Sequence, residues 1–134
     1  MPSSIPDDFL ARFILDKRYS KPDNQGHVKY NVFLPPIDKK KLSVYRIQGL
    51  DESEVWAIGD TFVASVQGKP LIARADILAE DVIGVSLSVT PEPAPHPRHA
   101  DITGCPDDRP AQREYALRLA RAAKLRINPD DIAA

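Results

Sequence analysis

Residues 85–90, VSLSVT, and residues 111–125, AQREYALRLARAAKL, decide the fold class of this chain. In the first stretch valine and leucine alternate with serine and threonine, which predicts a strand with one buried and one solvated face. In the second stretch tyrosine, leucine and alanine recur at helical spacing, which predicts an amphipathic helix. A chain that combines such a strand with such a helix is typical of the α+β class, with the helix packed on one face of the sheet.

The long helix has a clear beginning and end in the sequence. Asp107 or Asp108 can cap its N-terminus, and Pro110 suits the first turn, where its missing N–H leaves no carbonyl unpaired. The Asn-Pro pair at 128–129 ends the helix, because the residue before a proline disfavours the helical conformation. We therefore expect the helix to run from the proline to about residue 125.

Other stretches with the strand pattern predict a sheet of about five mostly antiparallel strands. A short central helix is expected among them, because Asp51 and Glu54 have the spacing of a capping box and Gly59 follows as a stop. Residues 101–110 have the composition of a compact loop. The predicted strands cover residues 9–15 (with a short helix as the alternative), 28–34, 42–47, 71–78 and 85–90, and the short helix covers residues 52–58.

The composition is that of one globular domain. The chain has 134 residues, of which 43% are hydrophobic, and its formal net charge of −1 excludes wholesale attraction to nucleic acid or anionic lipid. Cys105 is the single cysteine, so no intramolecular disulfide can form. There is no signal peptide and no apolar run of about 18 residues, so we expect a cytoplasmic protein outside the membrane. Residues 1–8 and 128–134 are expected to be loose tails around this single domain.

Residues 91–101, PEPAPHPRHAD, place two of the three histidines of the chain on a proline-rich segment. Alternating prolines favour an extended polyproline path, on which side chains three residues apart point the same way. His96 and His99 would then share a face and divide acid and base roles, with Asp101 orienting one ring. The alternative is structural: His96 packs against a loop and the aspartate caps a turn. The ligand set is too small to predict a metal site.

Arg46 is unusual because it lies inside an apolar strand pattern, SVYRIQ. A guanidinium stays charged on burial, so it must reach solvent or find an anion. One interpretation is an arginine on the wet side of the sheet, and the other is an anion clamp that faces the two histidines. Arg74 and Asp76 lie two apart in a predicted strand and are expected to form an ion pair on one face, or to balance the charge of Arg46.

The predicted C-terminal helix carries a basic face. Its cationic residues fall within one arc of the helical wheel, opposite tyrosine, leucine and alanine. Such a face is usually only solvated, and the alternative is contact with the phosphates of a nucleic acid. The residues of this candidate face are Arg113, Arg118, Arg121 and Lys124.

Sequence motifs for nucleotide or metal-dependent catalysis are missing. The chain has no Walker loop, GxGxxG, GxSxG, HExxH or CxxC motif, so no cofactor is predicted. No serine stands in a recognisable nucleophile motif, and Trp56 is expected to belong to the core. The serines considered are Ser43, Ser65, Ser86 and Ser88.

Residues 96–106, HPRHADITGCP, followed by a capped helix, resemble an HPxHAxIxGxP block of small uncharacterised bacterial proteins. Together with the segments LSVYRIQGL and ARADI, the resemblance covers residues 42–125. It implies no activity. A tryptophan usually follows the glycine of that block, where this chain has Cys105, so this is expected to be a packing position and not a catalytic thiol.

Three functions fit these observations. The first is a small accessory protein that acts in a complex with a protein partner, because no catalytic motif is present while the proline segment and the basic helix look exposed. The second is a small hydrolase or phosphate-binding enzyme that uses His96 and His99 with Arg46. The third is nucleic-acid contact through the basic helix.

Overall fold

One antiparallel sheet organises the chain, as the α+β pattern predicts. The computed structural model describes residues 8–36 and 39–129. Within these residues the sheet has six strands in the order β4-β5-β2-β1-β3-β6, where about five were expected. The strands are β1 (Phe9–Ile14), β2 (Leu42–Arg46), β3 (Ala73–Leu78), β4 (Ser88–Pro91), β5 (His99–Thr103) and β6 (Lys124–Ile127).

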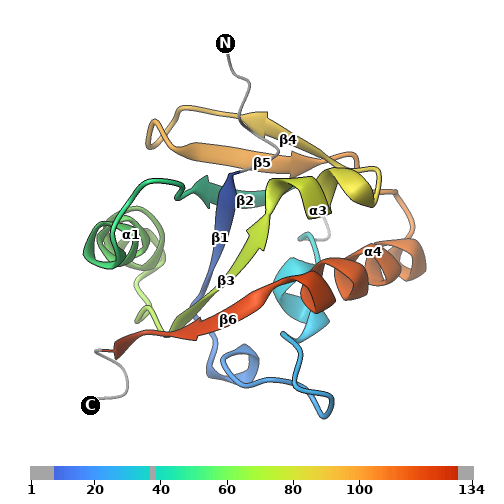
Figure 1. Ribbon diagram of the computed structural model, residues 1–134, viewed down its shortest axis with the longest axis horizontal. Coiled ribbons are helices and arrows are strands. Elements are labelled where there is room, and N and C mark those ends of the chain that lie inside the picture. Colours follow the sequence, from blue (N-terminus) through green and yellow to red (C-terminus); the bar gives the residue numbers. More distant parts are fainter. Residues whose placement is uncertain (1–7, 37–38, 130–134) are drawn as a thin grey trace.

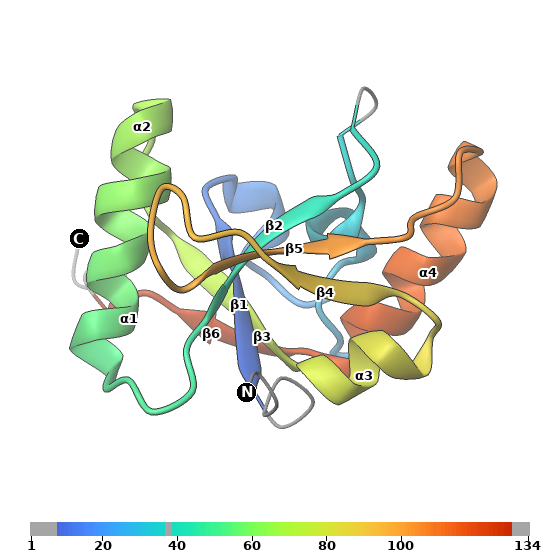
Figure 2. The same cartoon turned by 90° about the horizontal axis from the view of Figure 1, so that it is seen from above.

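Helices cover both faces of this sheet, so that the described part of the chain has three layers (Figure 1, Figure 2). Figure 2 shows α1 and α2 on one side of the strands and α3 and α4 on the other. The first side carries a continuous helical run of α1 (Glu52–Gly59), the π-helical turn η4 (Asp60–Ala64) and α2 (Ser65–Gln67). The second side carries the 3-10 helix η3 (Tyr30–Phe33), α3 (Ala79–Gly84) and α4 (Arg109–Ala122). A further 3-10 turn, η2 (Lys17–Tyr19), follows β1.

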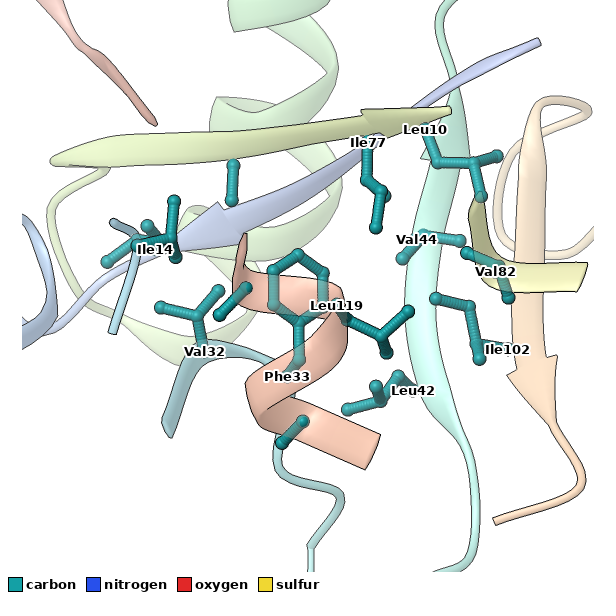
Figure 3. Packing of buried hydrophobic residues seen from close by; sticks show 14 of the residues in the cluster. Leu10, Ile14, Val32, Phe33, Leu42, Val44, Ile77, Val82, Ile102 and Leu119 are labelled. Atoms are coloured by element: carbon teal, nitrogen blue, oxygen red, sulfur yellow. The ribbon is translucent and has the colours of Figure 1, made fainter. Parts of the chain in front are cut away.

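The larger hydrophobic core lies between the sheet and the layer of α3, α4 and η3. Phe33 from η3 and Leu119 from α4 are both 1% exposed and belong to the same buried cluster (Figure 3). Full burial of a leucine or phenylalanine side chain contributes about 1.5–3 kcal/mol. The cluster therefore fixes α4 and η3 against the strands. The strand and α3 residues that Figure 3 labels in it are Leu10, Ile14, Leu42, Val44, Ile77, Ile102 and Val82.

A smaller core lies on the opposite face, under the run from α1 to α2. Gly59 is at the point of closest approach, since a Cβ atom on it would lie 2.6 Å from Cε1 of Phe13. The α-helix α1 ends at Gly59, as the sequence predicts, but the chain does not leave the helical conformation there. The helical run continues to Gln67 and ends at Gly68, which has φ 67°. The members of the smaller core are Ala11, Phe13, Tyr45, Ile47, Val55, Ile58, Ala64 and Leu71.

Both predicted helix starts are confirmed. The side chain of Asp51 accepts a hydrogen bond from the backbone N of Glu54 at 2.9 Å, and the Glu54 carboxylate accepts one from the Asp51 backbone, which completes the capping box. Of the two candidate caps for α4, Asp108 is the one that caps the helix, and its carboxylate accepts a hydrogen bond from the backbone N of Ala111 at 3.1 Å. A cap of this kind stabilises a helix by about 1 kcal/mol.

Residues 28–34 do not form the predicted strand. They contain η3, in which Val32 and Phe33 are both buried although they are adjacent. Adjacent residues of a strand point to opposite faces, so a strand cannot bury both on one side. The alternation in the sequence placed Phe33 on the polar side, whereas the 3-10 turn aims it into the larger core.

The proline-rich stretch forms a hairpin loop and not an extended polyproline segment. It joins β4 to β5, which pair antiparallel. The backbone N of His99 donates to the carbonyl O of His96 at 2.9 Å, so this part of the loop turns. The expected geometry with both imidazoles on one side of a polyproline helix is therefore absent. Residues 101–103, which were expected in a loop, belong to β5.

The strand predicted at residues 85–90 is present but shifted towards the prolines. It begins only at Ser88 and ends at Pro91. Ser86 has φ 69°, a left-handed conformation that an extended strand cannot contain. Pro91 is compatible with β4 because this strand lies at the edge of the sheet.

The C-terminal helix ends earlier than the sequence predicts. It stops at Ala122, and the next residues form β6, which pairs with β3. Asn128 is buried and donates from Nδ2 to the carbonyl O of Leu71 at 2.9 Å, so the chain is not a loose tail at residue 128. Asp8 is buried as well. The remainder of the predicted tails, residues 1–7 and 130–134, lies outside the described residues.

Arg74 and Asp76 form the predicted ion pair on one face of β3. Arg74 is 1% exposed, and its Nε donates to Oδ1 of Asp76 at 2.9 Å. Its Nη2 also donates to Oε2 of Glu52 at 2.9 Å, and its Cζ lies 4.6 Å from the centre of the Trp56 ring. Two carboxylates therefore balance this buried cation, and Trp56 packs against it.

Candidate functional site

Ser43, His99 and Asp101 meet on the sheet face that also carries α1. In the antiparallel pair of β2 and β5, Ser43 lies opposite Asp101, and Tyr45 lies opposite His99. Opposite and alternate residues of paired strands share one face, so the sheet register alone brings these side chains together. The Oγ atom of Ser43 lies 2.7 Å from Nε2 of His99. A hydroxyl and an imidazole at this distance can exchange a proton.

The other ring nitrogen of His99 fixes the tautomer of this pair. Nδ1 lies 2.9 Å from the backbone carbonyl O of Glu92, in the loop after β4. A carbonyl oxygen only accepts hydrogen bonds, so Nδ1 carries the proton in the neutral ring. Nε2 is then the acceptor of the Ser43 hydroxyl. A hydroxyl, an imidazole and a group that orients the ring are thus arranged as a nucleophile, a base and an orienting group would need to be.

Asp101 lies beside Nε2 of His99, the nitrogen that contacts Ser43, and not beside Nδ1. Its Oδ1 atom is 3.7 Å from Nε2 of His99, and its Oδ2 atom is 3.5 Å from Nζ of Lys41. The sequence predicted that this aspartate would orient an imidazole, but that place is taken by the Glu92 carbonyl. The geometry instead allows the carboxylate to stabilise positive charge on Nε2 after a proton arrives there.

Arg12 reaches this site through the gap between β1 and β2. These strands pair only at Leu10 with Arg46 and Ala11 with Tyr45, and beyond that register they separate. The guanidinium of Arg12 donates from Nη1 to the carbonyl O of Ser43 at 2.9 Å and from Nε to that of Val32 at 3.1 Å. Burial lowers the pKa of Arg12 to about 10.

Two adjoining cavities open beside Ser43 and His99. They have four lining residues in common, Arg12, Ser43, Gln67 and His99. The smaller one, of about 200 Å³, is mostly apolar, and the larger one, of about 550 Å³, is lined by charged groups. We call them the apolar arm and the charged arm of the groove. The apolar arm is completed by Phe13, Tyr45, Phe62, Val63, Val66 and Pro95. The charged arm is completed by Pro36, Lys39, Lys41, Glu92, Ala94 and Asp101.

His96 does not join His99 in the groove. Its Nδ1 accepts a hydrogen bond from the backbone N of Arg98 at 3.0 Å, and its ring stands edge-on to Phe62 at 4.9 Å between centres. It lines a separate cavity next to α1. This is the structural alternative expected from the sequence, and only His99 of the two histidines contacts the serine.

Arg46 lies on the other face of the sheet. It alternates along β2 with Tyr45, which faces α1, and therefore points to the face of the larger core. Its Nη1 atom is 4.0 Å from Oδ2 of Asp8. The expectation that Arg46 clamps an anion in front of the histidines is not met. Arg12, which the sequence did not single out, is the arginine at this site.

The predicted basic face is divided between two elements. Arg113, Arg118 and Arg121 are exposed on α4, whereas Lys124 lies on β6 because the helix ends before it. Lys124 lines a cleft with Arg74 and Glu52 that shares no lining residue with the groove. The three helical arginines remain a basic surface, and they do not contact the groove.

Cys105 behaves as a packing residue. It is free, half-buried, and lies against the larger core. Burial raises the pKa of its thiol, which disfavours the reactive thiolate. This agrees with the packing position that the resemblance implied. In the described part of the chain no three histidine, cysteine or acidic side chains gather as a metal site.

Comparison of the chain with protein-family models, curated proteins and solved structures finds no match. Among the described residues no helix has both the length and the apolar character needed to cross a membrane. The function must therefore be inferred from the groove itself.

Proposed function

We propose that the protein is a small serine hydrolase that cleaves carboxylic esters through an acyl-enzyme on Ser43. The observation that carries this proposal is the 2.7 Å contact between Ser43 Oγ and His99 Nε2, with Nδ1 held by a backbone carbonyl. A serine is a weak nucleophile by itself, and a hydrogen-bonded, oriented base is what activates it. Ser43 is exposed to solvent and lies where both arms of the groove meet, so a substrate can reach it.

In the proposed reaction, the Ser43 hydroxyl proton moves to Nε2 of His99 while Oγ bonds to the ester carbonyl carbon. The bond from this carbon to the leaving oxygen then breaks, and the leaving alcohol takes the proton from Nε2. Water next gives a proton to Nε2 and attacks the acyl carbon, and Ser43 recovers the proton as its bond to carbon breaks. Each time Nε2 is protonated, the Asp101 carboxylate at 3.7 Å stabilises the imidazolium.

The groove supports small ester substrates and not extended polymers. Its two arms, of about 200 and 550 Å³, have the size of small-molecule sites. The base is oriented by a neutral carbonyl and not by a carboxylate, so proton transfer from serine gains less electrostatic help. Esters have better leaving groups than amides, so a serine that is activated less strongly can still cleave them.

The test is labelling and turnover of the purified protein. A fluorophosphonate probe should add to Ser43 once per chain by intact mass, and 4-nitrophenyl butyrate should be hydrolysed. Ser43→Ala should abolish both, and His99→Ala should lower the rate by about 100-fold or more. Ser65→Ala, an exposed serine on α2, is the matched control and should behave as the wild type. Equal hydrolysis by the Ser43→Ala protein would end the proposal.

The two other functions expected from the sequence stay predictions. An accessory role in a complex requires a protein partner, and a protein that stays monomeric and recovers no partner from its host would exclude it. Contact with nucleic acid rests on Arg118 and Arg121 of α4, and the aromatic residue of α4, Tyr115, packs against the larger core instead of standing free to stack on bases. Binding that persists unchanged when both become glutamate would exclude that role.

A further inference from the structure

Arg12 is a partly buried cation that forms no ion pair with the part of the chain that the structure describes. None of the carboxylates in the described ranges, 8–36 and 39–129, forms an ion pair with it, and its hydrogen bonds go to two backbone carbonyls. Arg74, which is fully buried, has both Asp76 and Glu52 as partners. Partial burial weakens the hydration of a cation, and an anion bound beside it restores the lost stabilisation. The free charge of Arg12 therefore points to a ligand.

The charge lies next to the proposed nucleophile. Arg12 lines both arms of the groove and donates to the carbonyl O of Ser43 itself. In the charged arm, the cations Arg12, Lys39 and Lys41 face the carboxylates Glu92 and Asp101, so positive charge is in excess among the described lining residues. The apolar arm on the other side of Ser43 offers mainly aromatic and aliphatic side chains.

We infer that the substrates are esters whose acyl part is apolar and whose alcohol part carries a carboxylate or a phosphate. The acyl group lies in the apolar arm, and the anion lies in the charged arm against Arg12. This inference rests on the proposed function, because it places the two halves of the substrate on either side of Ser43. The groups that select the substrate are then Arg12, with Lys39 and Lys41 beside it.

The expected effect follows from the kind of contact. A hydrogen bond that joins a guanidinium to an anion changes an equilibrium by about 10- to 100-fold. The burial that lowers the pKa of Arg12 still leaves the group charged at neutral pH, and it reduces screening by water. Anionic esters should therefore be preferred over neutral ones of the same size by about 10- to 100-fold in kcat/KM.

The test compares three butyrate esters of similar size: ethyl butyrate, butyryloxyacetate and the butyrate of 2-hydroxyethyl phosphate. The quantity measured is the ratio of kcat/KM for each anionic ester to that for ethyl butyrate. Arg12→Gln should lower this ratio by about 10- to 100-fold, and Arg12→Lys should retain most of it. Arg18→Gln removes an exposed arginine paired with Asp16, and it is the matched control with an unchanged ratio. The comparison between the two anionic esters decides whether the site prefers a carboxylate or a phosphate.

A ratio near one in the wild type, or a ratio that Arg12→Gln leaves unchanged, would overturn the inference and leave the hydrolase proposal standing. Equal loss on all three esters would assign Arg12 to positioning Ser43 through its carbonyl. The wild type also tests the inference without any variant, since added salt should shrink the preference for the anionic esters.

A binding measurement separates this inference from the proposed function. Ser43→Ala lacks the nucleophile and retains Arg12, so titration calorimetry with hexanoate and with hexanol reports the anion site alone. Hexanoate should bind more tightly than hexanol, and the double variant with Arg12→Gln should lose that difference. If no ester is hydrolysed while this difference is present, the anion site stands and the hydrolase proposal fails.

Discussion

Gly59→Ala tests whether close packing under the first helical run holds the groove in shape. Gly59 has φ −61° and ψ −43°, so alanine can adopt its backbone without strain. The obstacle is space. A Cβ atom there would lie 2.6 and 2.7 Å from two ring carbons of Phe13 and 2.8 Å from a methyl of Leu71. These separations are far below carbon–carbon contact near 3.5 Å, so the ring of Phe13 must move.

Two opposing effects decide the sign of the change in stability. Alanine in place of glycine inside a helix stabilises by about 1 kcal/mol. Overpacking of a well-filled core costs about 1–3 kcal/mol. Because the clash involves a stiff ring in a buried cluster, we expect a net loss near 1 kcal/mol, which lowers Tm by roughly 3 °C for a domain of this size.

The change should reach the site as well. Phe13 packs on Tyr45 at 5.8 Å between ring centres, and Tyr45 packs on His99 at 5.2 Å. A displaced Phe13 therefore displaces Tyr45, which packs against His99. We expect the proposed ester hydrolysis to fall together with Tm.

The assay is urea unfolding followed by Trp56 fluorescence, with Gly84→Ala as the control. Gly84 ends α3 and has no atom within 4 Å of a Cβ placed on it, so alanine there should be neutral or stabilising. The reasoning would be refuted if Gly59→Ala were as stable as Gly84→Ala. That result would mean that Phe13 moves aside freely and that the smaller core is loosely packed.

Three further substitutions test interactions that stabilise the fold. Glu52→Gln removes the carboxylate whose pKa is lowered by the hydrogen bond from Arg74, a stabilisation present above the ordinary glutamate pKa and lost as acid protonates the group. The stability gap between this variant and the wild type should thus be largest at neutral pH and close on acidification in urea titrations. Asp108→Ala removes the cap of α4 and should cost about 1 kcal/mol in thermal unfolding. Asn128→Ala leaves the Leu71 carbonyl without its buried donor and should cost about 1–3 kcal/mol by the same measurement.

The fold class, the caps and several strands could be predicted from local patterns because local chemistry determines them. Asp51 and Asp108 cap helices through contacts with residues three positions away. Residues 28–34 were misread because η3 gains its stability from α4 and the sheet, which lie far away in sequence. A pattern of alternating residues cannot distinguish a strand from a 3-10 turn that inserts one side chain into a core.

The site was half visible in the sequence. His99 and Asp101 were identified, but the prolines before them suggested a polyproline path, and the strand that begins at His99 was missed. With residues 99–103 taken as a strand, both side chains share one face by simple alternation. Ser43 carries no motif, and its role depends on the register between β2 and β5. Arg12 reaches the site only because β1 and β2 separate, which no local pattern encodes.

The strand order also dictates when the groove can exist. Ser43 and His99 are 56 residues apart in the chain. The strand β1 pairs with β2 and β3, and long stretches of chain separate it from both. Among the described pairs only β4 and β5 form a local hairpin. Such long-range pairing slows folding, because loop closure precedes the contacts that reward it. During synthesis from the N-terminus, Ser43 is made well before His99, its proposed base. The contact between Ser43 and His99 therefore forms only after β5 has been made and has paired with β2, so a chain truncated before His99 would lack the proposed base.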